Sequence, residues 1–216
     1  KREEAYASVH GCTKFYRRTP DRTEILQEGI VMYAYKGFHK NLTCTMGKGT
    51  YQYEVNKWYE EKEANCVKNG FHCCENPLDC LTYYPLNGDN RFFLVEAAGD
   101  INESGTDKIS CTKIRLLKEL TPVDIAVHAA RYMFRHPARE WHHDVCKEYG
   151  FARLTPFVIV RGKNPAAAGT KGSSLVLLKE YAHTRGIQAM NVITVDGEKY
   201  KAGTTYNIDG RVVDRE

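Results

Sequence analysis

The segment from Asn69 to Tyr84 constrains the fold more than any other part of the sequence. Asn69-Gly70 is a turn signal, and Phe71 to Cys74 follows it as a short strand. Asn76 can cap a helix that has Pro77 at its first position, because the proline ring already holds a helical φ. The segment therefore predicts a turn, a strand and a helix in direct succession.

Further strands are predicted on both sides of this segment. Residues 30–38 form an apolar run that ends in a turn at Gly37, and residues 51–55 alternate between apolar and polar side chains. Period-two alternation is typical of a half-buried strand. We also expect strands over residues 91–97 and 108–120.

Helices are predicted after these strands. Thr121-Pro122 repeats the cap-plus-proline pattern and opens a helix that runs to about Arg135. Pro137 interrupts it, and a second helix is expected over residues 138–149, with Gly150 as its C-terminal cap.

Residues 151–216 change in character and predict a small all-β appendage made of hairpins. Short apolar strands at 157–160 and 175–178 flank a turn-rich connection. The predicted fold class is therefore α+β, with a mixed or antiparallel sheet packed against helices. The predicted parts are an N-terminal arm (1–29), an α+β core domain (30–150) and the β-hairpin appendage (151–216).

Charge and hydropathy limit which partners and which cellular compartment are expected for the protein. The formal net charge of +4 is small, and Lys and Arg never form runs longer than two, so no nucleic acid partner is expected. No apolar run approaches the ~20 residues of a membrane helix, so no membrane is expected either. The first residues lack an apolar signal core, and the eight cysteines include no C-x-x-C pair. We therefore expect a cytoplasmic protein with reduced, mostly buried thiols.

Two groups of residues could carry chemistry. On the expected second helix, His142 and Cys146 would share one face and Glu140 and His143 another, a spacing that could place zinc or iron. Each face offers only two ligands, so no metal site is predicted. His72 beside cysteines 73, 74 and 80 could supply a base and a nucleophile. Buried thiols are usually inert, so no catalytic residue is assigned.

The sequence from Met32 to Tyr84 resembles an uncharacterised domain family met mainly in phage and prophage genomes. The shared pattern is Tyr-Lys-Gly-Phe (35–38), Leu-Thr-Cys (42–44), Tyr-x-Tyr-x-Val (51–55), Gly-Phe-His-x-Cys-Glu-Asn-Pro-Leu-Asp (70–79) and Tyr-Tyr (83–84). This resemblance implies phage ancestry and a common fold. It implies no established activity, no catalytic residues and no known cofactor.

A second set of residues resembles ADP-ribosyltransferase-like folds. Tyr35-Lys36-Gly37, Gly70-Phe71-His72, Tyr83-Tyr84 and Val95-Glu96 follow the order of that family. The resemblance would assign Lys36 to the nicotinamide ribose, Tyr83 or Tyr84 to stacking, and Glu96 to the developing positive charge. The family's Ser-Thr-Ser and Glu-x-Glu elements are missing.

From these patterns we predict a phage-encoded binding protein that acts in the infected bacterial cell on a host factor or a nucleotide-type small molecule, as a counter to host defence. The ligand would bind in a cleft between residues 35–39 and 70–84. Aromatic side chains would stack on its ring, and a cationic side chain would contact a phosphate. The predicted ligand-binding residues are Tyr35, Lys36, Phe38, His39, Phe71, His72, Tyr83, Tyr84, Arg91 and Glu96. The alternatives are an NAD-using transferase and a virion or assembly protein that uses the C-terminal hairpins, and the sequence leaves the oligomeric state open.

Overall fold

The computed structural model describes residues 24–26, 29–46, 49–66, 68–86, 88–103 and 107–214. Most of the predicted N-terminal arm (1–29) and the central residues of the turn at 46–49 lie outside these ranges. Two helices lie in these ranges, α1 (Asp79–Tyr83) and α2 (Pro122–Arg135). The strands are β1 (Glu24–Leu26), β2 (Gly29–Phe38), β3 (Thr43–Met46), β4 (Gly49–Gln52), β5 (Trp58–Glu60), β6 (Phe71–Cys73), β7 (Arg91–Glu103), β8 (Ile109–Leu120), β9 (Val145–Ala152), β10 (Phe157–Gly169), β11 (Ser174–Glu180), β12 (Ile187–Thr194) and β13 (Tyr206–Asn207).

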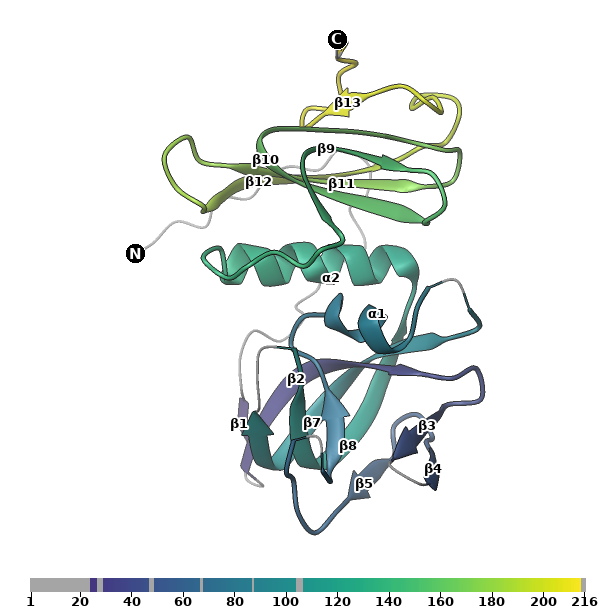
Figure 1. The fold of residues 1–216 in the computed structure, drawn as a ribbon, viewed down its shortest axis with the longest axis vertical. Coiled ribbons are helices and arrows are strands. Elements are labelled where there is room, and N and C mark those ends of the chain that lie inside the picture. The colour runs from purple at the N-terminus through teal and green to yellow at the C-terminus, as the bar shows by residue number, and fades with distance from the viewer. Residues whose placement is uncertain are drawn as a thin grey trace.

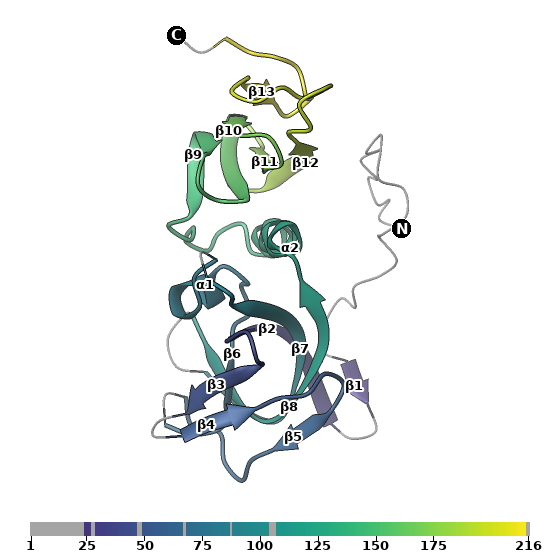
Figure 2. The ribbon, with the colours of Figure 1, turned by 90° about the vertical axis from the view of Figure 1, so that its right-hand side faces the viewer.

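The first sheet is antiparallel and curls into a ring. Its strand order is β1-β2-β7-β8-β5, and β6 also pairs with β8. Just beyond β6, Cys74 exchanges two backbone hydrogen bonds of 2.8 Å with Tyr35 of β2. The strands β2, β7, β8 and β6 therefore enclose a common interior, as Figure 2 shows.

Alternation along β2 separates two environments. Ala34 and Phe38 point into the ring and are fully buried. Tyr35 points the other way, toward α2. Neighbouring side chains of a strand face opposite sides of the sheet, so Lys36 lies on the interior side with Ala34 and Phe38.

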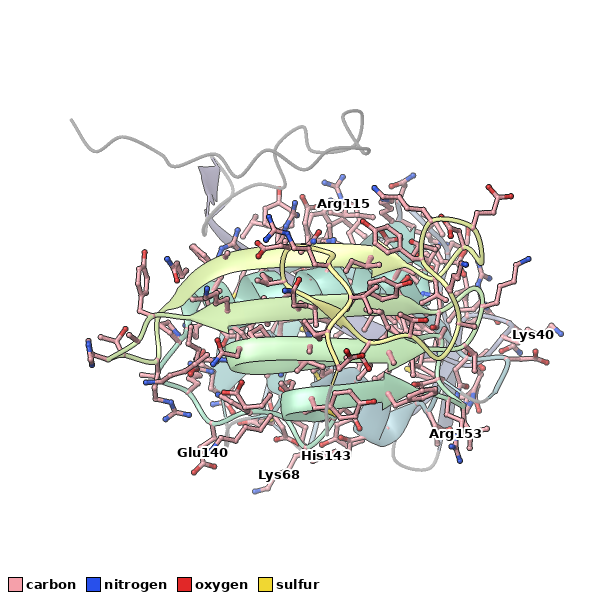
Figure 3. All side chains as sticks on the ribbon, turned by 90° about the horizontal axis from the view of Figure 1, so that it is seen from above. Lys40, Lys68, Arg115, Glu140, His143 and Arg153 are labelled. Carbon is pink, nitrogen blue, oxygen red and sulfur yellow. The ribbon has the colours of Figure 1, made fainter. Side chains whose placement is uncertain are left out.

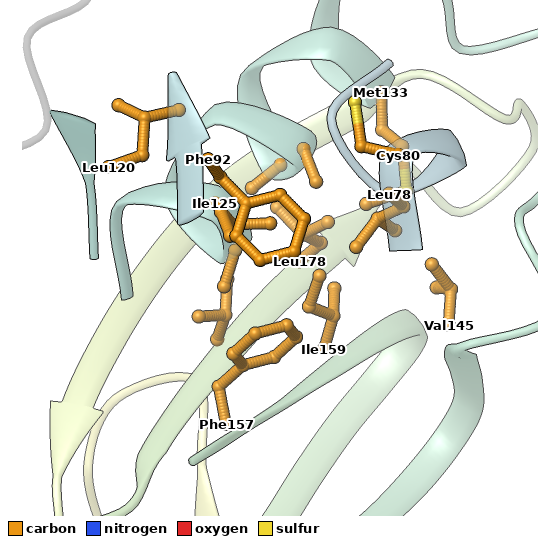
Figure 4. Close-up of a cluster of buried hydrophobic side chains, with 14 of the residues drawn as sticks. Leu78, Cys80, Phe92, Leu120, Ile125, Met133, Val145, Phe157, Ile159 and Leu178 are labelled. Carbon is orange, nitrogen blue, oxygen red and sulfur yellow. The ribbon is translucent and has the colours of Figure 1, made fainter. Parts of the chain in front are cut away.

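Helix α2 lies between the two sheets, as Figure 1 shows. Its N-terminus carries the predicted cap: Thr121 and Asp124 form a reciprocal capping box, with Pro122 at the first turn. The buried side chains of α2 join residues of both sheets in one core (Figure 4). Because this core includes Phe92 from β7 and Ile159 from β10, the two sheets are stabilised together.

The second sheet is mixed, with the order β12-β11-β10-β13 and with β9 also paired to β10. The pairs β9–β10 and β10–β11 are parallel, and β11–β12 is antiparallel. The expected run of hairpins is therefore wrong for most of this sheet. Strand β10 continues to Gly169 through the segment predicted as a turn-rich connection, because its small residues Ala166–Ala168 are buried between neighbouring strands.

The predicted second helix, 138–149, is also wrong. Residues 136–144 form an irregular segment, and β9 begins at Val145. Gly150 is not a helix cap. It lies in β9, where a Cβ atom would stand 2.6 Å from a methyl carbon of Val158. Pairing with β10 overrides the local helix pattern, as tertiary contacts often do.

The protein is thus mostly β, with antiparallel and mixed sheets, rather than α+β with packed helices. The division near residue 150 stays a prediction, although β9 crosses that point. Neither described helix has the length and hydropathy that a membrane-spanning helix needs.

Candidate functional site

The aromatic cavity is a hollow of about 680 Å³ in the first sheet. The end of β2, β3, β6 and α1 all contribute to its lining. Its lining consists of Tyr35, Lys36, Gly37, His39, Cys44, Thr45, Tyr53, Glu61, Lys68, Asn69, Gly70, Phe71, His72, Cys73, Cys74, Cys80, Tyr83, Tyr84 and Lys108. Most of the predicted cleft, between residues 35–39 and 70–84, is therefore brought together.

Lys36 is the cation at the inner wall of the aromatic cavity. Its side chain is buried, and its ammonium nitrogen donates to the carbonyl oxygen of His72 at 2.7 Å. The same nitrogen lies 5.5 Å from the ring centre of Phe38 and 5.8 Å from that of Tyr53. Within the described ranges, no carboxylate forms an ion pair with it. An ammonium has three donors, and only one described hydrogen-bond acceptor contacts that of Lys36.

Aromatic side chains form the wall around this cation. Tyr84 and His39 meet edge to face with ring centres 5.3 Å apart. Gly37 makes room for Tyr84, because a Cβ atom at residue 37 would stand 2.5 Å from that ring. Burial raises the pKa of Tyr84 to about 12, so its hydroxyl stays protonated at neutral pH.

Two further lysines make the cavity positive. Lys68 and Lys108 line it, whereas Glu61 is its one acidic lining residue. Lys108 donates to the Tyr83 hydroxyl at 3.2 Å, and that hydroxyl donates to Asp107. The excess of cations favours an anionic ligand.

Cys73 and Cys80, two of the cysteines near His72 in the sequence, are not activated as nucleophiles. The described cysteines are free thiols, and Cys12 lies outside the described ranges. A hydrogen bond to Cys111 and burial raise the pKa of Cys73, and a hydrogen bond to Cys74 together with burial raises that of Cys80. A protonated, buried thiol is a poor nucleophile. Burial also lowers the pKa of His72, which leaves its imidazole neutral.

Three predicted ligand residues lie outside the aromatic cavity. Phe38 is fully buried in the core beneath it. Arg91 donates to both carboxylate oxygens of Glu119 at 2.7 Å. Glu96 accepts from Nε of Arg115 at 2.7 Å, on the outer face of the sheet. The register of β2 with β7 explains the position of Glu96. Lys36 lies opposite Phe93, and both face the interior of the ring, whereas Glu96 lies opposite Tyr33, and both face outward.

A second hollow, which we name the carboxylate cavity, occupies about 730 Å³. It is lined by Glu75, Asn76, Asp79, Glu103, Asp107, Lys108, Ile109, Tyr132, Arg139, Glu140, Trp141, His142 and His143. Burial, followed by the charge of Asp107, raises the pKa of Asp79 to about 7. The sequence singled out Glu140, His142 and His143 as possible metal ligands on a helix. It did not bring them together with Asp79, because the lining comes from α1, the end of β7, the start of β8, α2 and the segment 136–144.

Comparison with known proteins adds one similarity. The family model described as Domain of unknown function (DUF7666) matches residues 32–128. The match contains every residue that lines the aromatic cavity and ends within α2. No curated protein and no solved structure matches the chain.

Proposed function

We propose that the aromatic cavity binds a nucleotide-type small molecule, an anion that carries a flat ring. The observation that carries the proposal is the buried Lys36 ammonium at its wall, which has one described hydrogen-bond acceptor and no described counter-ion. A buried charge without a partner is costly. A ligand phosphate would supply the missing negative charge.

The cavity's size and lining agree with this ligand class. Small-molecule sites commonly span ~300–1,000 Å³ and combine apolar walls with a few polar groups. Tyr84 and His39 offer ring faces and edges for a base, while Lys36, Lys68 and Lys108 offer cations for phosphates. That the ligand is a host signal, and that the protein acts in an infected bacterial cell, stays a prediction from the resemblance.

The transferase alternative would need Glu96 beside the bound ligand. Glu96 lies on the opposite face of the sheet from Lys36 and is paired with Arg115. The proposal is therefore of a binding protein without turnover. The assembly alternative has no specific contact in its favour.

Binding is tested by native mass spectrometry with NAD and cyclic nucleotides, followed by calorimetry on any ligand found. Lys36→Met keeps most of the side-chain volume and removes the charge. We expect it to fold at least as stably as the wild type and to bind at least ~10-fold more weakly, as loss of a charged hydrogen bond implies. Lys40→Met is the matched control, because Lys40 is exposed and pairs with Asp89 outside the cavity.

Two outcomes would overturn the proposal. One is that no nucleotide of the panel binds, and the other is that Lys36→Met binds as tightly as Lys40→Met. Release of nicotinamide from NAD that stops in Glu96→Gln would instead establish the transferase, because a binder should be indifferent to that substitution.

A further inference from the structure

The segment before β9 brings two imidazoles and a carboxylate together at the edge of the carboxylate cavity. One ligand atom each from His142, His143 and Asp144 lies within 4.8 Å of the others. One Asp144 oxygen is 3.4 Å from Nδ1 of His142, and the other is 3.5 Å from Nε2 of His143. Figure 3 shows His143 and Glu140 at one edge of the molecule, and the His143 side chain is 75% exposed.

The contacts of His142 fix which of its nitrogens is free of a proton. The backbone N–H of Asp144 donates to Nδ1 at 3.2 Å, so in the neutral ring the proton is on Nε2. Nε2 faces Oδ1 of Asp79 at 4.0 Å. A metal-binding histidine usually directs its other ring N–H at a carboxylate, which fixes the ring and makes the ligand more basic. This tautomer leaves the Nδ1 lone pair unprotonated. Asp79, at 4.0 Å, is beyond hydrogen-bond distance of Nε2, so its carboxylate would have to move closer to Nε2 to hold the ring when an ion is bound.

We propose that His142, His143 and Asp144 bind a first-row divalent cation of the zinc type, with Asp79 as a positioning residue. Two imidazoles and one carboxylate are a common ligand set for such ions, and the remaining positions would hold water. The ion would take the Nδ1 lone pair that now accepts a single 3.2 Å hydrogen bond. The three ligand residues lie outside the residues matched by the family model, whereas Asp79 lies within them.

The segment that holds the three ligands is anchored to the second sheet. The Arg161 guanidinium is fully buried, donates to the carbonyl oxygen of Pro137 at 2.9 Å and lies 4.9 Å from the ring centre of Trp141. The backbone N–H of Val145, the first residue of β9, donates to the carbonyl oxygen of His142 at 3.0 Å. Because both ends of this segment are held in place, binding a metal ion would cost little conformational entropy of the chain, which favours metal binding.

The test is a titration of untagged, EDTA-treated protein with Zn²⁺ by calorimetry and with Co²⁺ by absorption spectroscopy. We expect one ion per chain and a Co²⁺ spectrum without a thiolate charge-transfer band, because no cysteine is among the ligands. His143→Ala and Asp144→Ala should each weaken binding at least ~10-fold. Both side chains are partly exposed, so both variants should fold.

His183→Ala is the matched control, since His183 is an exposed histidine in the turn between β11 and β12. It should bind Zn²⁺ like the wild type. Asp79→Asn should weaken binding without changing the stoichiometry or the Co²⁺ band positions. The proposal is overturned if the wild type binds no Zn²⁺, if His143→Ala binds as tightly as His183→Ala, or if the Co²⁺ spectrum shows thiolate ligands.

Discussion

The hydroxyl of Tyr35 lies 2.9 Å from Nδ1 of His128, and this contact joins the wall of the aromatic cavity to α2. The two rings meet edge to face with centres 5.5 Å apart. Burial raises the pKa of Tyr35 to about 12, and burial together with the charge of Arg131 lowers that of His128 to about 4. Both groups are therefore neutral at pH 7.

This pair predicts a loss of stability in mild acid. In the unfolded chain a histidine titrates near its ordinary pKa of ~6.5. Between pH 6.5 and 4 the unfolded state therefore binds more protons than the folded state, and stability falls as the pH falls. We expect His128 to contribute about 2 kcal/mol of this loss, allowing for its partial exposure.

Urea unfolding at pH 7 and at pH 4.5 measures this contribution. In His128→Gln the difference in unfolding free energy between the two pH values should be smaller than in the wild type. His183→Gln, an exposed control, should keep the wild-type difference. Equal pH dependence in all three proteins would show that the Tyr35–His128 contact does not control acid stability.

Gly37 predicts a second effect, on the shape of the aromatic cavity. A Cβ atom there would stand 2.5 Å from Cδ2 and 2.9 Å from Cβ of Tyr84, so rotating the Tyr84 ring would not remove the clash. We expect Gly37→Ala to destabilise the fold by roughly 1–3 kcal/mol, as overpacking does, and to weaken any ligand that stacks on Tyr84.

Gly88→Ala is the control for Gly37→Ala, because the nearest atom to its Cβ, on Asn90, is 3.4 Å away. In thermal unfolding, the free energy of unfolding of Gly88→Ala should lie within ~0.5 kcal/mol of that of the wild type. If Gly37→Ala were as stable as Gly88→Ala, the backbone at residue 37 would have to lie farther from Tyr84 than the structure shows.

Glu180 predicts a third effect, in the second sheet. Its Oε1 accepts from Nε of the fully buried Arg161 at 2.8 Å. Glu180→Gln keeps the shape and removes the counter-charge, which leaves a buried guanidinium without a carboxylate. Breaking one side of such a pair typically costs ~3–5 kcal/mol, and urea unfolding should show a loss of that order. Glu119→Gln, which breaks the exposed pair with Arg91, should cost less than ~1 kcal/mol. Similar losses of unfolding free energy in the two variants would mean that the burial of an ion pair does not determine the cost of breaking it.

The sequence predicts the parts of the fold where local and tertiary preferences agree. Strand β2 and helix α2 were expected within a residue or two of their bounds, because an apolar run and a capping box with proline agree with the tertiary packing. The cap predicted at Asn76 and Pro77 was wrong, because α1 begins at Asp79 after Leu78. The prediction of a helix over 138–149 was wrong because local and tertiary preferences conflict there. Its helical pattern is local, whereas β9 exists because β10 offers it a parallel partner.

The same distinction applies to the candidate site. Tyr35, His39 and Tyr84 could be assigned to one cavity because strand ends and a neighbouring helix bring nearby motifs together. Glu96 could not be placed, since its direction depends on the register of β2 with β7. A shift of one residue in register would have moved Glu96 to the interior. The lining residues Lys68 and Lys108 were not among the predicted ligand-binding residues.

The N-terminal cap of α2 predicts a fourth effect, and it tests whether the two sheets unfold together. The side chain of Thr121 accepts from the backbone N–H of Asp124 and donates to its carboxylate at 2.8 Å. Thr121→Ala should cost about 1 kcal/mol, because it leaves an N-terminal N–H of the helix without its acceptor. Since α2 packs against both sheets in one core, the loss should lower the hydrogen-exchange protection of β7 and of β10 equally. Thr121→Ser keeps the hydroxyl and should restore most of the stability. A loss confined to the first turn of α2 would show instead that the helix end frays without affecting the shared core.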